Sequence, residues 1–177
     1  MPIRNPAYQL LVARYTPPVF AALLLSIFLA ASLETAQVVA VHDGDTITVR
    51  MDGHTEKVRL IGIDSPEIND ERQEYRDAAY AARDYARSRL GGETVTLETE
   101  ARQDDRDAYG RLLRYVILRD GTNVNEELVR KGYARVYDKF QFTLKPRFKA
   151  AEAEAKREKL GVWKLPPGRW REVRSTR

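Results

Sequence analysis

The sequence predicts an α+β domain in which a small β-barrel packs against about three helices. Three short segments with the alternation of half-buried strands come first, followed by a helical segment, two more strands and further helical segments. This order favours a small closed barrel, because a parallel sheet requires strands and helices to alternate. The five-stranded candidate is the oligonucleotide/oligosaccharide-binding (OB) fold, whose mouth between loops can hold a ligand.

Five segments show the strand pattern. In the second of them, Ile47 and Val49 follow Asp45 on one face and alternate with polar residues, and the pair Asp52-Gly53 marks the next turn. The fifth is more continuously apolar. The expected strands are residues 38–41, 45–51, 57–63, 94–98 and 112–118.

Three later segments show helical spacing of apolar residues. The pair Gly91-Gly92 ends the first of them. Asn123 and Glu126 have the spacing of a capping box, and Pro146 suits the first turn of the last helix. The expected helices run from about residue 70 to 90, from 123 to 131 and from 146 to Gly161, the residue that ends the last one.

The positive charge of the chain is confined to its ends. The 177 residues carry a formal charge of +4, yet residues 33–163 hold 23 Lys and Arg against 25 Asp and Glu. Binding of a polyanion must therefore depend on local placement of charge. The absence of cysteine excludes disulfides, zinc thiolates and a thiol nucleophile.

Residues 1–32 have the pattern of a signal peptide. Arg4 and Arg14 precede a stretch of 19 uncharged residues, and the part from Val19 to Leu29 is strongly apolar. Small residues around Ser32 suit cleavage after that residue. An uncleaved membrane anchor is the alternative, since 19 residues approach the length that spans a bilayer, and a buried core helix is a third. We therefore expect an exported domain at residues 36–163, periplasmic or secreted, or else anchored outside the cytoplasm. Residues 164–177 form a basic tail that we expect to be disordered.

The segment Asp43-Gly44-Asp45-Thr46 allows two interpretations. Asp-Gly between alternating apolar runs is typical of a hairpin turn. Asp45, however, opens a strand on its core-facing side, which places the carboxylate at the rim of the barrel. The next strand ends near Asp64, and two aspartates on adjacent strand ends can hold Ca²⁺ or another hard cation.

Arg59 precedes Asp64 by five residues, so an ideal strand would direct the two side chains to opposite faces. We expect them at the same mouth, which requires the strand to end before Asp64 or a bulge near Gly62. A second arginine, Arg111, enters the fifth strand after a turn. It is either a surface residue or, with Arg59 and a cation, part of a phosphate site, because guanidinium groups pair bidentately with phosphate oxygens.

These motifs together resemble the staphylococcal (thermo)nuclease family. The resemblance rests on three ordered motifs and on two helical segments, and it covers about residues 36–163. The segments that carry it are Asp43-Gly44-Asp45-Thr46, Arg59-Leu60 through Asp64-Ser65-Pro66-Glu67, Tyr109-Gly110-Arg111, and residues 123–136 and 151–163.

The resemblance implies a role for each matching residue. Asp45 and Asp64 would bind calcium, and Ser65 would add a ligand through its backbone carbonyl. Glu67 would act as general base for the attacking water. Arg59 and Arg111 would hold the scissile phosphate, and Tyr109 would lie near a phosphate of the bound nucleotide.

The implied activity is calcium-dependent hydrolysis of phosphodiester bonds in DNA and RNA, leaving 3′-phosphates, with Mg²⁺ as an alternative cation. DNA and RNA would be substrates of a monomer that needs no protein partner and meets a membrane only through an uncleaved leader. A non-catalytic OB-fold module that binds nucleic acid is the alternative function, and a purely structural extracellular protein is a third.

Overall fold

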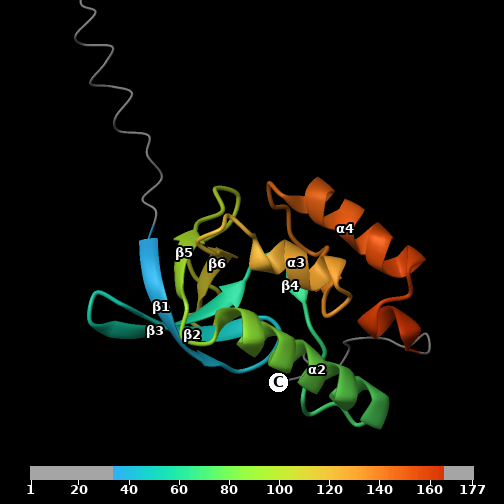
Figure 1. Cartoon of the computed structure of the whole chain (residues 1–177). Helices are drawn as coiled ribbons and strands as arrows, with labels where there is room; N and C mark the ends of the chain where they lie inside the picture. The colour runs from blue at the N-terminus through green and yellow to red at the C-terminus, as the bar shows by residue number, and fades with distance from the viewer. Residues whose placement is uncertain (1–33, 166–177) are drawn as a thin grey trace, which may run out of the picture. The chain divides into compact units, whose positions relative to one another are not determined.

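The computed structural model describes residues 34–165, whose centre is a closed β-barrel (Figure 1). Its strands close in the order β1-β2-β3-β6-β5, with β5 pairing back onto β1. The β3–β6 pair is parallel and the other pairs are antiparallel. The strands are β1 (Glu34–Val41), β2 (Thr46–Met51), β3 (His54–Leu60), β5 (Thr94–Glu98) and β6 (Leu112–Ile117). The predicted five-stranded α+β barrel of the OB type is confirmed.

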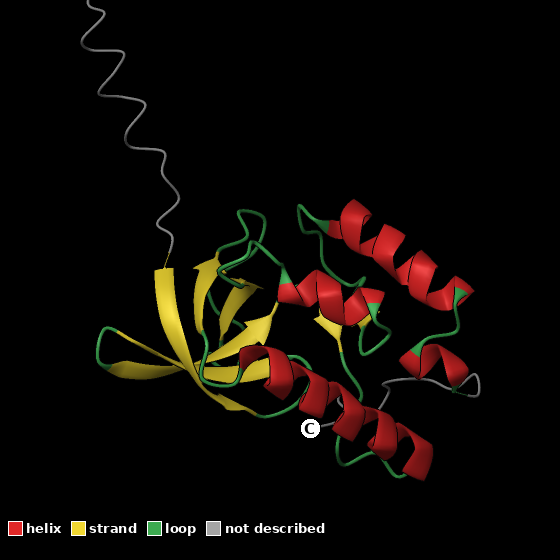
Figure 2. Cartoon of the chain, in the orientation of Figure 1, coloured by secondary structure: helices red, strands yellow, loops and turns green. Residues whose placement is uncertain are grey.

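Helices and a small second sheet complete the domain. The elements outside the barrel are β4 (Ile63–Asp64), α2 (Gln73–Leu90), α3 (Val124–Arg130), β7 (Arg135–Val136), α4 (Lys145–Arg157) and the short 3₁₀ helix η2 (Gly161–Lys164). Helix α3 lies between the barrel and α4, in contact with both, and α2 contacts β1 (Figures 1 and 2). Strand β4 pairs with β7, and neither of these two-residue strands was expected from the sequence.

The alternating pattern places apolar side chains inside the barrel. Ile47 and Val49 of β2 are buried, as are Val95 and Leu97 of β5. On the helices, the buried stripes are the predicted ones, including Phe148, Ala151 and Ala155 of α4. Asp52 and Gly53 join β2 to β3 with φ of 49° and 79°, the two positive values of a type I′ hairpin turn.

Several predicted boundaries were wrong. Strand β1 begins at Glu34, four residues before the expected start. Helix α2 begins at Gln73 because the carboxylate of Asp70 accepts the backbone N–H of Arg72 and forms a turn first. Helix α4 ends at Arg157, short of the predicted end at residue 161, since Lys159 takes a left-handed conformation with φ of 51°.

Strand β3 ends at Leu60, and Gly62 then turns the chain into β4. Gly62 has φ of 76°, and a Cβ atom there would lie 2.7 Å from the ring of Phe142. Glycine is therefore required for both conformation and space. The turn resets the strand alternation, so Arg59 and Asp64 can reach the same side of the molecule.

No helix within residues 34–165 is both long enough and apolar enough to cross a membrane. The expected leader at residues 1–32 lies outside the described residues, as does the tail from residue 166 onward. The leader, the tail and the domain limits therefore remain predictions.

Candidate active site at the barrel mouth

The loop between β1 and β2 holds Asp45 in place. The backbone N–H of Asp45 donates to Oδ1 of Asp43 at 2.9 Å, so Asp43 is the turn residue. Gly44 does not have a positive φ; it is needed because a Cβ there would lie 2.7 Å from Cβ of Ser65 and 2.9 Å from Cβ of Ala82. The glycine lets this loop approach the segment after β4 closely.

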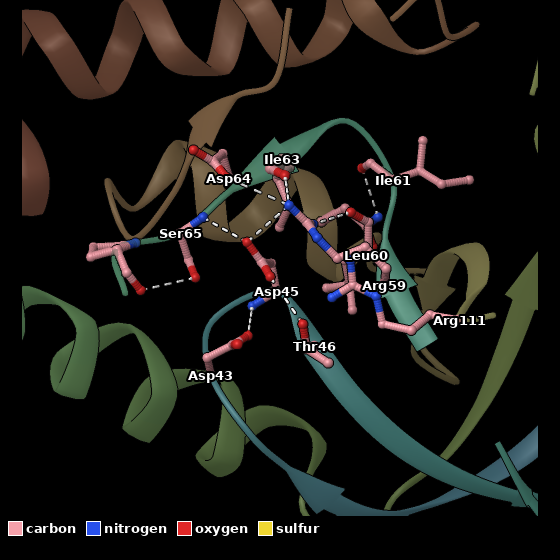
Figure 3. Close-up of polar contacts among 12 residues, drawn as sticks. Asp43, Asp45, Thr46, Arg59, Leu60, Ile61, Ile63, Asp64, Ser65 and Arg111 are labelled. Carbon is pink, nitrogen blue, oxygen red and sulfur yellow. Dashed lines mark hydrogen bonds and ion pairs between the residues drawn. The ribbon is translucent and has the colours of Figure 1, made fainter. Parts of the chain in front are cut away.

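Asp45, Asp64 and Arg59 form one buried ionic cluster (Figure 3). Nη2 of Arg59 lies 3.1 Å from Oδ2 of Asp45 and 3.6 Å from Oδ1 of Asp64. All three residues are at most 9% exposed. The carboxylates come from the start of β2 and from β4, and both face the guanidinium that β3 supplies.

Backbone carbonyl groups fix the guanidinium of Arg59. Nη1 donates to the carbonyl of Leu60 at 2.8 Å, and Nη2 donates to the carbonyl of Ile63 at 2.8 Å. Both carbonyls belong to the turn around Gly62. The turn that brings Asp64 to the site thus also orients Arg59.

Ser65 is buried beside this cluster, at 1% exposure. Its backbone N–H donates to Oδ2 of Asp45 at 2.8 Å, which ties the strand end after β4 to the loop before β2. Its hydroxyl lies 3.4 Å from the carbonyl of Pro66. The hydroxyl thus contacts the backbone of the next residue, and the ligand role of the Ser65 carbonyl stays a prediction.

The cluster carries an excess of negative charge. One guanidinium faces two carboxylates, and Asp43 and Glu67 line the adjacent cleft. Burial and the neighbouring Asp45 carboxylate raise the pKa of Asp43 to about 7, despite the opposing effects of the Asp45 N–H and of Arg59. Buried charges of one sign require a partner of the other, which a divalent cation can supply.

The donors fit a hard cation. Carboxylate and carbonyl oxygens are the ligands that Ca²⁺ prefers, and water commonly completes its coordination. Within residues 34–165 no three carboxylate or histidine side chains converge on one point as a metal-binding group. Asp45 and Asp64 lie on the same guanidinium group, and their assignment as cation ligands, with the carbonyl of Ser65, stays a prediction.

A cleft of about 250 Å³ adjoins the cluster. Asp45 and Arg59 contribute to its wall, and so do the predicted base Glu67 and the second predicted arginine, Arg111. The full lining is His42, Asp43, Asp45, Thr46, Lys57, Arg59, Glu67 and Arg111. The structure therefore gathers four of the predicted site residues around one small space, and Asp64 and Ser65 contact two of them, Arg59 and Asp45.

The turn at residues 107–111 is built around the carboxylate of Asp107. Oδ1 accepts the backbone N–H groups of Tyr109 and Arg111, both at 3.0 Å, and Oδ2 accepts Nε of Arg111 at 2.7 Å. Burial raises the pKa of Asp107, but the hydrogen bonds from Arg111 and the backbone outweigh it and hold the pKa below its usual value. Asp107 thus orients the Arg111 guanidinium.

Tyr109 lies apart from the small cleft. Its side chain is 77% exposed and lines a second, larger groove, which Arg59, Asp64 and Arg111 also border. The ring centroid lies 5.4 Å from the guanidinium carbon of Arg111. The two arginines therefore stand where the small cleft and the larger groove meet.

Sequence reasoning missed three contributors to the site. Asp107 could have been found, because an aspartate two residues before Tyr109 and four before Arg111 suits a side-chain-capped turn. Lys57 lies two residues before Arg59 in β3, on the same face of the strand, and the ring of His42 forms a hydrogen bond with Oγ1 of Thr48 at 2.7 Å. Both line the cleft.

A family model described as "Staphylococcal nuclease homologue" matches residues 57–165, well over half of the chain. The chain belongs to the staphylococcal nuclease family. Asp45 lies before the matched segment, so its place in the site comes from the geometry. The predicted family membership is thereby confirmed.

Relatives within this family come from distant organisms. An uncharacterized protein of Methanocaldococcus jannaschii is 35% identical, over 72% of this chain and 70% of its own. A protein of Escherichia coli O157:H7 named an uncharacterized endonuclease is 37% identical, over 76% and 83%. A thermonuclease of Staphylococcus hyicus is 33% identical, over 75% and 78%.

The Asp107–Arg111 pair leads to a prediction about stability. We expect Asp107→Asn to lower the free energy of unfolding by about 1–2 kcal/mol at pH 7, because the charge-assisted hydrogen bonds to Arg111 are lost. The folded-state pKa lies below that of the unfolded chain, so this stabilisation is complete above pH of about 4 and is lost as the pH falls through the folded-state value.

Urea denaturation of the unchanged protein and of Asp107→Asn, at pH 7 and at pH 3, measures this effect. The difference between their free energies of unfolding should shrink at the lower pH. Asp104→Asn, at an exposed position three residues before Asp107, is the matched control and should change the free energy of unfolding at neither pH. An equal difference at the two pH values would contradict the assigned pairing.

Proposed function

We propose that this protein is a calcium-dependent nuclease that hydrolyses phosphodiester bonds of DNA and RNA and leaves 3′-phosphates. The observation that carries the proposal is the placement of Arg59 within 3.6 Å of the Asp45 and Asp64 carboxylates, at a cleft that Glu67 and Arg111 also line. The names of the relatives, an endonuclease and a thermonuclease, support hydrolysis of nucleic acid.

Asp45, Asp64 and the Ser65 carbonyl would hold the cation. When bound, Ca²⁺ or another divalent ion polarises a phosphoryl oxygen and neutralises part of its charge. The protein supplies the remaining parts of the site. Nucleic acid reaches them through the larger groove, which Arg59 and Arg111 border.

The reaction is a hydrolysis at phosphorus. Glu67 accepts a proton from water, whose oxygen forms a new bond to phosphorus as the bond to the 5′-oxygen breaks. The departing 5′-oxygen takes up a proton to become a hydroxyl group, and the phosphate stays on the 3′-oxygen. Arg59 and Arg111 stabilise the charge that grows on the phosphoryl oxygens.

The two arginines have different freedom for this task. Arg59 is buried and already donates to two carbonyls, so it presents its remaining N–H groups in a fixed direction. Arg111 is about one-fifth exposed and pairs through Nε and Nη2 with Asp107. Both side chains are therefore oriented before any substrate arrives, which lowers the cost of reaching the transition state.

The proposal predicts cation-dependent degradation of plasmid DNA and of RNA by the purified protein. Arg111→Ala should slow turnover by about 10²–10³-fold, the usual effect of removing one donor to the transition state. Glu67→Gln should slow it by about 10²–10⁴-fold, as expected for a general base. A chelator should stop the reaction and added Ca²⁺ should restore it, and the fragments should carry 5′-hydroxyl and 3′-phosphate ends.

The matched control is Arg87→Ala, on the exposed side of α2 and lining neither the cleft nor the groove. It should leave the rate unchanged. Arg111 is preferred to Arg59 for the main test, because removing Arg59 leaves buried carboxylates without their counterion and endangers folding. Nucleic acid that is bound but left intact with every divalent ion would indicate a non-catalytic binding module.

We also propose that the domain acts outside the cytoplasm. The support is the order of basic and apolar residues before Ser32. The full chain is expressed in a bacterium, and the cells are fractionated. N-terminal sequencing of the protein from the periplasm or the medium should show that it begins at Leu33. Recovery of the uncut chain from the cytosol would contradict export.

A further inference from the structure

The small cleft has a side that the proposed chemistry does not use. His42 and Lys57 line this cleft without a role in the reaction, and neither of them lines the larger groove. At about 250 Å³ the cleft is smaller than the usual small-molecule pocket of about 300–1,000 Å³, so it suits a phosphate group better than a whole nucleotide. A polynucleotide that enters through the larger groove therefore has to leave the cleft on another side, and His42 and Lys57 mark that side.

Lys57 is a cation without a partner among residues 34–165. Arg59 pairs with Asp45. Arg111 pairs with Asp107. Lys57 makes no ion pair and no side-chain hydrogen bond within the described part of the chain, and its side chain is exposed. Its ammonium group, on a flexible stem, can therefore turn to an anion without breaking an existing contact.

The spacing of Lys57 and Arg59 fits consecutive phosphates. The two residues are separated by one position of β3 and so face the same side of the strand. At about 3.3 Å per residue, their Cα atoms are about 6.6 Å apart along the strand. Consecutive phosphates of an extended single strand have a similar spacing. A scissile phosphate at Arg59 therefore brings a neighbouring phosphate to Lys57.

The residues of β2 opposite Lys57 and Arg59 are short and polar. Thr48 pairs with Lys57, and Thr46 pairs with Arg59. Oγ1 of Thr48 forms a hydrogen bond with Nε2 of His42 at 2.7 Å, which fixes the imidazole ring at the cleft. When this hydroxyl donates to Nε2, Nδ1 carries the ring proton and can donate to a phosphate oxygen.

The outer face of β1–β3 continues the cationic surface away from the cleft. Ile47, Val49 and Val58 are buried in the barrel, so the residues that alternate with them point outward. Cross-strand pairing links six outward positions, of which two are cations and none is a carboxylate. These positions are Gln37, Ala40, Thr48, Arg50, Thr55 and Lys57. The face therefore suits a polyanion, although residues 33–163 as a whole are slightly acidic.

The same six positions offer no ring on which a base could stack. None of them is aromatic, and the cations among them suit phosphate oxygens. Contacts to phosphates position a strand without reading its sequence. We therefore expect this surface to bind the backbone of a single strand whatever its bases are.

We propose that Lys57, with His42 beside it, binds the phosphate next to the scissile one, on the side away from the larger groove. The outer face of β1–β3 then carries the strand onward to Arg50. The inference rests on the proposed nuclease function and adds a second phosphate site to it. A substrate needs at least two phosphates to use this site.

Lys57→Gln tests the proposal through KM. For a single-stranded octanucleotide at about 0.1 M salt we expect KM to rise about 5-fold with kcat unchanged, because one phosphate contact of a single strand contributes a slope of about 0.7 to log affinity against log salt. At about 0.5 M salt the rise should shrink to less than about 2-fold. For a dinucleoside monophosphate, whose single phosphate is the scissile one, KM should stay the same.

Two further variants control for charge and for position. Lys57→Arg should keep the affinity of the unchanged protein, because the positive charge remains. The matched control is Lys131→Gln, which changes an exposed lysine at the end of α3 that lines neither the cleft nor the groove. Melting temperatures of all these variants should agree with that of the unchanged protein, because each changes an exposed side chain.

A binding experiment tests the site independently of cleavage. Glu67→Gln protein with Ca²⁺, with and without Lys57→Gln, is titrated with a labelled trinucleoside diphosphate at about 0.1 M salt. Lys57→Gln should weaken binding about 5-fold. When either linkage is replaced by an uncharged methylphosphonate, the remaining phosphate should occupy the scissile position, and Lys57→Gln should then have no effect.

An unchanged KM for the octanucleotide, an equal rise for the dinucleoside monophosphate, or a fall in kcat in place of the rise in KM would overturn the proposal. A loss of affinity that persists with one uncharged linkage would do the same. If the protein bound oligonucleotides but cut none, the nuclease function would fail, and the binding experiment alone would still decide whether Lys57 holds a second phosphate.

Discussion

The ion pairs of Arg59 with Asp45 and Asp64 are the interaction on which the rest of the site depends. Each of the three groups comes from a different strand or strand end, and each is buried. Removing one partner from such a buried cluster typically costs about 3–5 kcal/mol of stability, because it leaves a buried charge without a counterion and without contact with water. The single guanidinium cannot balance both carboxylates and their acidic neighbours. The unbalanced negative charge is what the proposed divalent cation would neutralise, which connects the packing of the barrel with its proposed chemistry.

Two glycines make this cluster possible. Gly44 allows the β1–β2 loop to approach Ser65. Gly62 turns the chain after β3, so that the carbonyls of Leu60 and Ile63 accept hydrogen bonds from Arg59. The barrel supplies rigid strand ends, and the turns between them direct the polar side chains to one mouth. From this mouth two spaces open, a small cleft with Glu67 and a larger groove towards Phe140. Arg59 and Arg111 border both spaces.

The sequence predicted the barrel well because strand alternation reports burial directly, as in Ile47 and Val49. It predicted the ionic cluster only through the combination of motifs, since the conflict between Arg59 and Asp64 is resolved by the backbone of Gly62. What it could not predict depends on contacts between distant segments. The pairing of β4 with β7 involves two residues on each side, too few for a periodic pattern. The hydrogen bond from Gln103 to the carbonyl of Gln141 likewise joins two distant segments, a contact that no local spacing encodes.

In the proposed site, Asp45 and Asp64 share one divalent cation beside Arg59. A crystal structure of the protein grown with Ca²⁺ and a non-hydrolysable dinucleotide tests it most directly. We expect one calcium ion with oxygens of both carboxylates at about 2.3–2.6 Å, and a phosphate oxygen of the dinucleotide completing its coordination beside Arg59. Calcium bound at another place, or a direct Asp45–Arg59–Asp64 cluster that persists with no ion at saturating Ca²⁺, would contradict the account.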